Sequence, residues 1–239
     1  INNSGTWSAE DNLTLDWHGA LKNSGTIYSK GNADLRANHL ANDKTIAAER
    51  NLSAAAKENI HNQGKLLAGE NMGIYAGKTL DNAGHAMESG NNLSIETGDA
   101  INNAAGIIKS GGSQQIKAGH TLTNTEGTLA ADGNINIQTD KMTGDGIVSA
   151  GKKAGILLEK DFTNTGRLEA GSSLSLAVKG NITNRKEILS RGHLALESKN
   201  IRNEETGEIK GADTETVAEN TWVNHGLVNG ENVHIRANH

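Results

Sequence analysis

The sequence lacks several residue types on which most folded domains of its size depend. Among 239 residues there is no cysteine and no proline, and the aromatic residues are three Trp, two Tyr and one Phe. Without cysteine no disulfide can hold the fold together, although this does not by itself fix a cellular compartment. Because aromatic side chains normally supply much of the bulk of a broad core, their scarcity predicts a narrow core of Leu, Ile, Val and Ala.

Membrane-spanning and nucleic-acid-binding functions are disfavoured as well. No apolar run approaches the length of about 18 residues that a membrane span needs, so we expect no membrane span. The formal net charge is −5, and no basic stripe with interleaved aromatic residues occurs, so we expect no nucleic-acid partner. We expect no signal peptide within these residues, because INNSGTW already lies inside the repeat described next. We therefore expect the chain to be a fragment of a longer protein.

A repeat of about 20 residues runs through the whole chain. Each repeat begins at an apolar residue, and consecutive starts are 19 to 21 residues apart. The twelve starts are Ile1, Leu21, Leu40, Ile60, Leu80, Ile101, Leu122, Met142, Phe162, Ile182, Ile201 and Trp222. Self-similarity at such a period is the signature of a solenoid, a propeller or an array of small units.

Within each repeat, apolar and polar residues alternate in short runs that are separated by glycine or polar turns. In the repeat FTNTGRLEAGSSLSLAV, for example, Leu174, Leu176 and Val178 alternate after the turn at Gly171. Alternation predicts strands with one buried face, and three strands of about four residues fit into one repeat. A propeller blade would need four strands and about 40 residues. We therefore predict an all-β fold, a parallel β-helix of about 12 coils with about 20 residues per coil, forming one domain over residues 1–239.

An asparagine stands two residues after the start of nearly every repeat. In a β-helix these residues would form one structural column: Asn3, Asn23, Asn42, Asn62, Asn82, Asn103, Asn124, Asn164, Asn184, Asn203 and Asn224. The repeat from Met142 has Gly144 at this position instead. Asn tolerates the left-handed conformation at turns and bonds local backbone, while stacked amides can also bond one another along a ladder. Either role fits the column.

Three repeats depart from the common plan. The alanine-rich repeat from Leu40 would make a helix by propensity, but its place in the register favours strands. The repeat from Ile101 puts Gln114 into its last apolar pair, and the repeat from Ile201 puts residues 213–216 there, so that we expect the latter coil to be loose or distorted. The repeat from Ile201 is also acidic. Its carboxylates form either a partner-facing patch or a solvated loop: Glu204, Glu205, Glu208, Asp213, Glu215 and Glu219.

Catalysis has one candidate constellation. Glu169 and Glu187 lie one repeat apart near the same outward column, with Arg167 and Arg185 beside them. Retaining glycosidases hold two carboxylates about 5–5.5 Å apart, close to the spacing of neighbouring coils. The alternative is a solvated outward face of alternating charge, which we favour. We therefore predict no catalytic residues.

The histidine and tryptophan residues do not indicate a ligand site either. His18 and His39 could stack across adjacent repeats, but zinc needs three or four converging ligands, so we expect neither a metal nor a cofactor. By their place in the pattern we expect Trp7 and Trp17 to point inward and Trp222 to fill a repeat start. None of the three is predicted to form an exposed platform for a sugar.

The recurring frame resembles the filamentous-haemagglutinin repeat over essentially the whole chain. The segments that carry the resemblance are INNSGTWSAEDNLTLDW, IHNQGKLLAGENMGIYA, LTNTEGTLAADGNINIQ and FTNTGRLEAGSSLSLAV. This resemblance implies a right-handed parallel β-helix in a filament of a Gram-negative exoprotein, secreted and displayed at the bacterial cell surface in association with the outer membrane. It also implies an outer-membrane two-partner-secretion transporter as a partner of the parent protein. The family includes haemagglutinin adhesins and contact-dependent growth inhibition proteins of the CdiA type.

Three functions remain open at this stage. The first is a filament segment that projects a binding or toxin region, with contact to target cells left open. The second is a receptor-binding or adhesion module that contacts a host or target-cell surface receptor, for which the irregular repeats from Ile101 and Ile201 are the best support. The third is a glycan-active β-helix enzyme. We rank them in this order.

Overall fold

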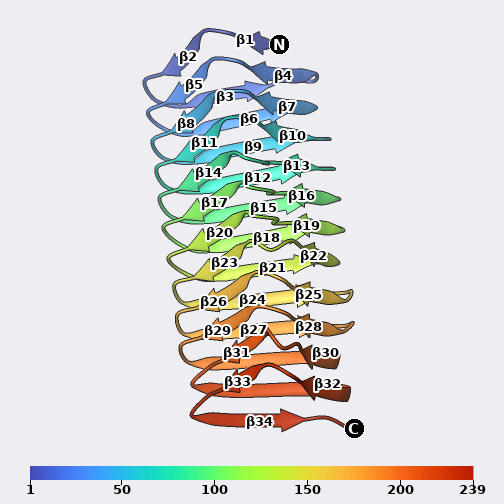
Figure 1. Ribbon diagram of the computed structural model, residues 1–239. Coiled ribbons are helices and arrows are strands. Elements are labelled where there is room, and N and C mark those ends of the chain that lie inside the picture. Colours follow the sequence, from blue (N-terminus) through green and yellow to red (C-terminus); the bar gives the residue numbers. More distant parts are fainter. Residues whose placement is uncertain (239) are drawn as a thin grey trace.

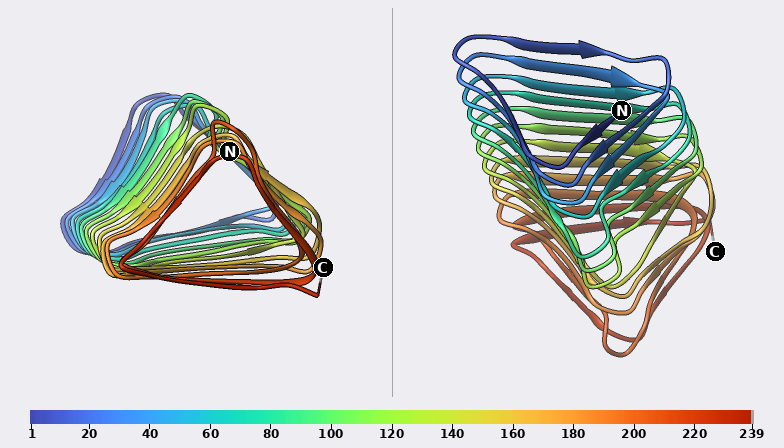
Figure 2. Two further views of the ribbon diagram at one scale, coloured as in Figure 1. Left: turned by 60° about the horizontal axis from the view of Figure 1, so that its bottom comes forward. Right: turned by 90° about the horizontal axis from the view of Figure 1, so that it is seen from above.

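The computed structural model describes residues 1–238 and contains, within that range, 34 strands and no helix. The chain winds around one axis, so that each repeat of the sequence becomes one coil (Figure 1). Seen along this axis the coils are triangular, with one strand on each of three faces (Figure 2). We number the coils 1 to 12 from the repeat starts Ile1 to Trp222 and the faces in chain order. None of the described segments is a helix that could cross a membrane.

The first face carries the strands that follow the repeat starts. They are β1 (Asn2–Asn3), β4 (Ala20–Asn23), β7 (His39–Asn42), β10 (Ile60–Asn62), β13 (Leu80–Asp81), β16 (Ala100–Asn102), β19 (Thr121–Thr123), β22 (Lys141–Thr143), β25 (Phe162–Asn164) and β28 (Ile182–Asn184). In coils 11 and 12 the ends of two long strands, which begin on the third face, take this place.

The second face is the most regular of the three. Its strands are β2 (Thr6–Ala9), β5 (Thr26–Ser29), β8 (Thr45–Ala48), β11 (Lys65–Ala68), β14 (Ala86–Ser89), β17 (Ile107–Ser110), β20 (Thr128–Ala131), β23 (Ile147–Ala150), β26 (Arg167–Ala170), β29 (Glu187–Ser190), β31 (Glu208–Lys210) and β33 (Leu227–Asn229). They form one continuous 12-stranded sheet.

The third face carries the longest strands. They are β3 (Leu13–Asp16), β6 (Ala33–Ala37), β9 (Leu52–Ala56), β12 (Met72–Ala76), β15 (Leu93–Thr97), β18 (Gln114–Ala118), β21 (Ile135–Thr139), β24 (Lys153–Leu158), β27 (Ser173–Val178), β30 (His193–Asn203), β32 (Asp213–Asn224) and β34 (Asn232–Arg236). β30 and β32 run on around the corner into the first face without interruption.

The register of the strands confirms the predicted parallel β-helix and its repeat starts. All pairs are parallel, and each joins equivalent positions of neighbouring coils. Ile60, for example, pairs with Leu40 of the coil before it and with Leu80 of the coil after it. Because side chains alternate between the two faces of a strand, this register stacks apolar residues on apolar residues inside the coil. Leu40, Ile60 and Leu80 are all fully buried, so the core is as narrow and aliphatic as the composition predicts.

One interruption divides the first face. Each described strand of this face pairs with the next, except that β22 does not pair with β25. The gap falls directly beside Gly144, whose φ of 109° takes the backbone out of the extended conformation. The first sheet therefore ends at coil 8, and β25 and β28 join the third-face sheet through β30.

The irregular repeats fold more regularly than predicted. The repeat from Leu40 forms β8 and β9, which confirms strands rather than a helix. The expectation of a loose coil in the repeat from Ile201 is wrong, since β32 is paired along both edges and buries Thr214 and Thr216 completely. Threonine is β-branched and small enough to occupy an inward position of a strand. The only irregularity in this pairing is a register shift near Ser198.

Candidate functional site

The asparagine column forms two hydrogen-bonded ladders inside the first corner of the coil. The side-chain nitrogen of Asn42 donates to the side-chain oxygen of Asn62 at 2.8 Å, and also to the carbonyl oxygens of Lys44 and Lys65. Equivalent amide–amide bonds run from Asn3 to Asn124 and again from Asn164 to Asn224. No asparagine of the column has a positive φ, so the column acts as a ladder and not as a set of left-handed turns.

The missing rung between the two ladders has a steric cause. A side chain at Gly144 would place its Cβ 2.3 Å from the backbone nitrogen of Thr125, which no real contact allows. The side-chain nitrogen of Asn124 keeps its bond to the carbonyl oxygen of Ile147 in the next coil, at 3.1 Å, as Asn103 does with Thr128. The ladders are buried apart from the last residue, Asn224, so they stabilise the coil and present no surface to a ligand.

A second polar ladder, which the sequence analysis missed, lies at the corner between the second and third faces. The side-chain oxygen of Asn51 accepts a hydrogen bond from the backbone nitrogen of Asn71 at 3.1 Å. The same contact joins successive coils through Asn12, Asn32, Asn51, Asn71, Asn92, Ser113 and Asn134. The available signal was an Asn placed just before the third strand at the period of the repeat, as in DNLTL, RNLSA and NNLSI.

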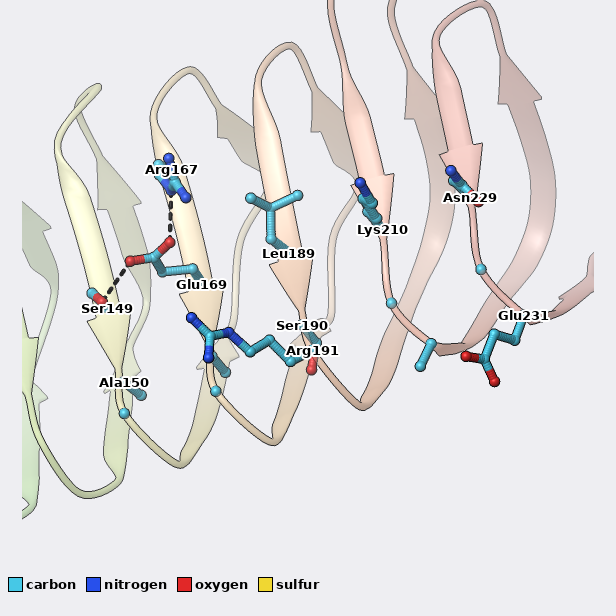
Figure 3. Close-up of a pocket in the computed structure, with 16 residues that line it drawn as sticks. Ser149, Ala150, Arg167, Glu169, Leu189, Ser190, Arg191, Lys210, Asn229 and Glu231 are labelled. Carbon is cyan, nitrogen blue, oxygen red and sulfur yellow. Dashed lines mark hydrogen bonds and ion pairs between the residues drawn. The ribbon is translucent and has the colours of Figure 1, made fainter.

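A groove of about 750 Å³ lies on the second face, across coils 8 to 12 (Figure 3). Five outward side chains from successive coils follow one another along it: Ser149, Glu169, Leu189, Lys210 and Asn229. At the corner beyond these strands the chain is mostly Gly and Ala, including Gly151, Gly171, Gly211 and Ala212. The groove exists because these small residues do not extend as far into the solvent as the longer side chains of the neighbouring column.

The charges in the groove divide into a paired end and a cationic middle. At one end Arg167 contacts Glu169 at 2.7 Å, and Ser149 donates to the other oxygen of this carboxylate at 2.7 Å. Arg191 and Lys210 form no ion pair with the described residues. Figure 3 shows Arg191 reaching across the groove toward the strand that carries Glu169. The arrangement is suited to hold an anionic group in the middle of the groove.

The candidate catalytic carboxylates are placed differently from the sequence interpretation. Glu187 pairs with Arg167, while Glu169 pairs with Leu189, so the two carboxylates do not share a column. The guanidinium of Arg167 lies between them, 2.7 Å from Glu169 and 3.3 Å from Glu187. Two carboxylates bridged by one guanidinium on an exposed face form a surface ion-pair network.

The acidic residues of coil 11 are not gathered into one patch. Glu204 and Glu205 lie in the turn after β30, Glu208 lies in β31 on the second face, and the other three lie in β32: Asp213, Glu215 and Glu219. Two of the six are already engaged. Asp213 lies 3.0 Å from the ring of His193, and a hydrogen bond from Arg202 lowers the pKa of Glu204. A partner that contacted all six residues would have to follow the coil around several faces.

The interpretation of the histidines changes in the structure. Ala20, not His18, lies opposite His39, so the two rings do not stack. His39 contacts Glu58 at 3.6 Å, and His61 contacts Asp81 at 3.7 Å. Within residues 1–238 no three His, Asp or Glu side chains gather in a way that could hold a metal ion.

One of the three tryptophan predictions is wrong. Trp7 and Trp222 pack partly against the core. Trp17, however, is 44% exposed. It stands level with Ala37, and the same inward column continues with Ala56 and Ala76 in the next coils. This corner is built for small side chains, so the indole ring of Trp17 lies outside it.

The coils, the polar ladders and the hollows together define a class of protein. The chain is a solenoid of stacked, nearly identical coils whose polar ladders hold the register, with shallow hollows on its faces. It belongs to the haemagglutinin repeat family, which matches residues 1–64 and 110–238. The family comprises secreted, surface-associated exoproteins of a structural and adhesive type and is not a family of enzymes. Comparisons with the curated proteins and with the solved structures gave no match.

Proposed function

We propose that this chain is a filament segment of a secreted bacterial exoprotein, which holds a binding or toxin-bearing region away from the cell surface. The observation that carries the proposal is the register. Every coil of 19 to 21 residues pairs in parallel with the next, and the asparagine ladders lock equivalent positions together. Each coil adds about 4.8 Å to the rod, so length is set by the number of repeats alone.

This proposal is supported by the family to which the chain belongs. We further propose that the parent protein is exported by an outer-membrane two-partner-secretion transporter, as the resemblance to filamentous haemagglutinins implies. Stability in such a rod comes from interactions between neighbouring coils, which suits a chain that folds progressively as it emerges from a transporter. Whether the parent protein is an adhesin or a growth-inhibition toxin carrier would be decided by the region that the filament projects.

The proposal is tested by removing whole coils. Deletion of residues 60–121 would join Asn59 to Leu122, which occupies the same register position as Ile60. Three coils would be lost, and we expect a folded rod that is shorter by about 14 Å in small-angle X-ray scattering. The matched control is deletion of residues 60–111, which ends in the middle of a coil, so that the coils on either side of the junction cannot stack as one continuous rod. In the parent exoprotein the in-register deletion should preserve export.

If both deletions unfolded alike, the coils would not be interchangeable units and the filament role would fail. If the in-register deletion folded but abolished the activity of the parent exoprotein, the deleted coils would themselves carry that activity. Circular dichroism of the two deletion variants shows whether each of them folds, so that a loss of folding is separated from a loss of activity.

A second candidate function is adhesion by the rod itself. The specific observation in its favour is the groove of coils 8 to 12, where Arg191 and Lys210 stand without an ion-pair partner among the described residues. We expect such a module to bind a surface receptor through an anionic group. The double substitution R191E/K210E should then abolish binding of the isolated chain to target cells. The control K65E/K109E changes the same charge on the same face outside the groove.

A further inference from the structure

A second hollow, of about 290 Å³, lies on the third face between coils 1 and 4. Trp17 of coil 1 and Tyr75 of coil 4 lie at its two ends, and Ala55 lies in the outward column between them. This hollow shares no residue with the groove of coils 8 to 12. A segment that served only as a spacer would have no need of it.

The hollow gathers the exposed aromatic side chains of a chain that has few. Phe162 is buried, and Trp7 and Trp222 pack partly against the core. Tyr28 donates its hydroxyl hydrogen bond to Glu49. The remaining two aromatic residues, Trp17 and Tyr75, are 44% and 49% exposed, and both line this one hollow. Leaving large aromatic surfaces in water is unfavourable, so their concentration here indicates a binding surface.

The hollow is created by a short side chain in the outward column of the third face. Further along this column Glu96 and Lys117 pair at 3.0 Å and cover the sheet. In coil 3 the column holds Ala55, which is too short to cover the space between Arg36 and Tyr75. A flat sheet surface walled by aromatic side chains is the result.

Polar groups stand around the same space. Arg36 contacts Asp34 at 3.1 Å, and Lys57 at the rim forms no ion pair with the described residues. The side-chain oxygen of Asn38 is buried and has no hydrogen-bond partner in the described chain, although its nitrogen donates to the carbonyl oxygen of His18. Aromatic faces combined with a few convergent polar groups are typical of small-ligand sites.

We propose that this hollow is a carbohydrate-binding site, in which the pyranose rings of an oligosaccharide stack their C–H faces on Trp17 and on Tyr75. The hydroxyl groups of the sugar would bond to the charged side chains of Arg36 and Lys57, which line the hollow. A sugar ring combines an apolar face with a polar rim, which is the combination that the hollow presents. The site goes beyond the filament role and does not depend on it.

The test uses the whole chain. A glycan array that includes chitotriose and lactose identifies a bound oligosaccharide. Isothermal titration calorimetry with the same oligosaccharide in solution then measures its affinity. We expect W17A and Y75A each to weaken binding by roughly tenfold, the equivalent of about 1.4 kcal/mol. W17F keeps an aromatic face and should recover most of the affinity. L157A is the matched control, because Leu157 is an exposed side chain of the same outward column, four coils beyond Tyr75.

Circular dichroism should show all four variants folded, since each of the substituted side chains is exposed. The proposal is overturned if no glycan on the array is bound, or if a bound glycan is insensitive to both W17A and Y75A. Loss of glycan binding in R191E/K210E with full binding in W17A would move the site to the groove and equally overturn it. None of these results would bear on the filament role, which the coil deletions test.

Discussion

The side-chain nitrogen of Asn62 lies 2.7 Å from the side-chain oxygen of Asn82, one coil further along the rod. The same nitrogen also reaches the carbonyl oxygens of Gly64 and Ala86. One side chain thus bonds its own turn and the turn of the following coil. Because the residue is buried, these bonds replace water that cannot enter, and the register of the two coils depends on them.

Removing this amide should be costly. In N62A the side-chain oxygen of Asn82 loses its side-chain donor and the side-chain nitrogen of Asn42 loses its side-chain acceptor, both in a buried site. The carbonyl oxygens of Gly64 and Ala86 each lose one donor. We expect the free energy of unfolding to fall by about 3 kcal/mol, as buried polar groups left without partners commonly cost 1–3 kcal/mol each. Urea unfolding followed by circular dichroism measures the change.

The control for this prediction is N224A at the exposed end of the second ladder. The side-chain oxygen of Asn224 accepts hydrogen bonds from Asn203 and from the backbone nitrogen of Gly226, and because the residue is exposed, water can replace both. A loss of less than about 1 kcal/mol is expected there. Equal losses in the two variants would mean that burial of the ladder does not govern its contribution.

Restoring the missing rung should fail. In G144N the new side chain would sit on a backbone with φ of 109° and would collide with the backbone around Thr125. We therefore expect destabilisation by more than about 1 kcal/mol, although the other repeats have Asn at this position. G73A is the comparison, because Gly73 has no atom near its would-be Cβ and lies in a strand. That variant should be neutral or slightly stabilised, and a stable G144N would refute the steric account.

Replacing Gln114 by leucine should raise the free energy of unfolding. Gln114 is buried between Leu93 and Ile135 in an otherwise apolar column, and its side-chain oxygen has no hydrogen-bond partner in the described chain. In Q114L this unpaired oxygen disappears and an apolar column becomes continuous. Although the side-chain nitrogen gives up its bonds to Ile108 and Ala130, we expect a gain of about 1 kcal/mol in thermal or urea unfolding. A clear loss of stability would show that these two bonds outweigh the unpaired oxygen.

The architecture could be predicted from the sequence because it depends on spacing. A column of Leu40, Ile60 and Leu80 at a fixed period leaves few alternatives to a stacked coil, and the register followed from it. The fate of Trp17 could not be predicted, because the parity of a strand says which side a residue faces but not whether the corner has room for an indole. The groove could not be predicted either, because it depends on the relative lengths of side chains that become neighbours only in the fold, such as Leu189 and Gly211, which both line it.

The polar positions were harder to interpret than the apolar ones. Residues Asp213–Thr216 look unfit for a core in composition, yet Thr214 buries its hydroxyl by donating to the carbonyl oxygen of Gly211 at 3.1 Å. The ladder through Asn51 and Asn71 was missed, since Asn before a strand also suits an ordinary turn. In both cases the hydrogen-bond partner belongs to structure that the sequence does not reveal locally.

The ion pair of Glu58 should be visible in an acid titration. A hydrogen bond from Lys78 at 2.9 Å, together with the charges of Lys78 and His39, lowers the pKa of Glu58 below its ordinary value of 4.5. A carboxylate whose pKa is lower in the folded state adds stability above pH 4.5, and this contribution is lost as the pH falls through the lowered pKa. Because the pair is exposed, its effect on the free energy of unfolding should be small.

Carbon-13 NMR of the Glu58 carboxyl group measures this shift directly. In K78M the main cause is removed, so the titration midpoint should rise toward 4.5. K117M serves as the control, because Lys117 pairs with Glu96 and does not contact Glu58. A midpoint that stayed unchanged in K78M would show that the contact does not persist in solution.

The central claim is that residues about 20 positions apart stack in register along one axis. Because the chain has no native cysteine, spin labels can be attached at single introduced cysteines, at Ser94 and Glu215. These positions share one outward column and are six coil steps apart. Double electron–electron resonance should give a narrow distribution near 29 Å, and replacing the Glu215 label by one at Ala195 should shorten the distance by about 4.8 Å. A broad distribution, or a distance that did not shorten by one coil spacing, would contradict the β-helix.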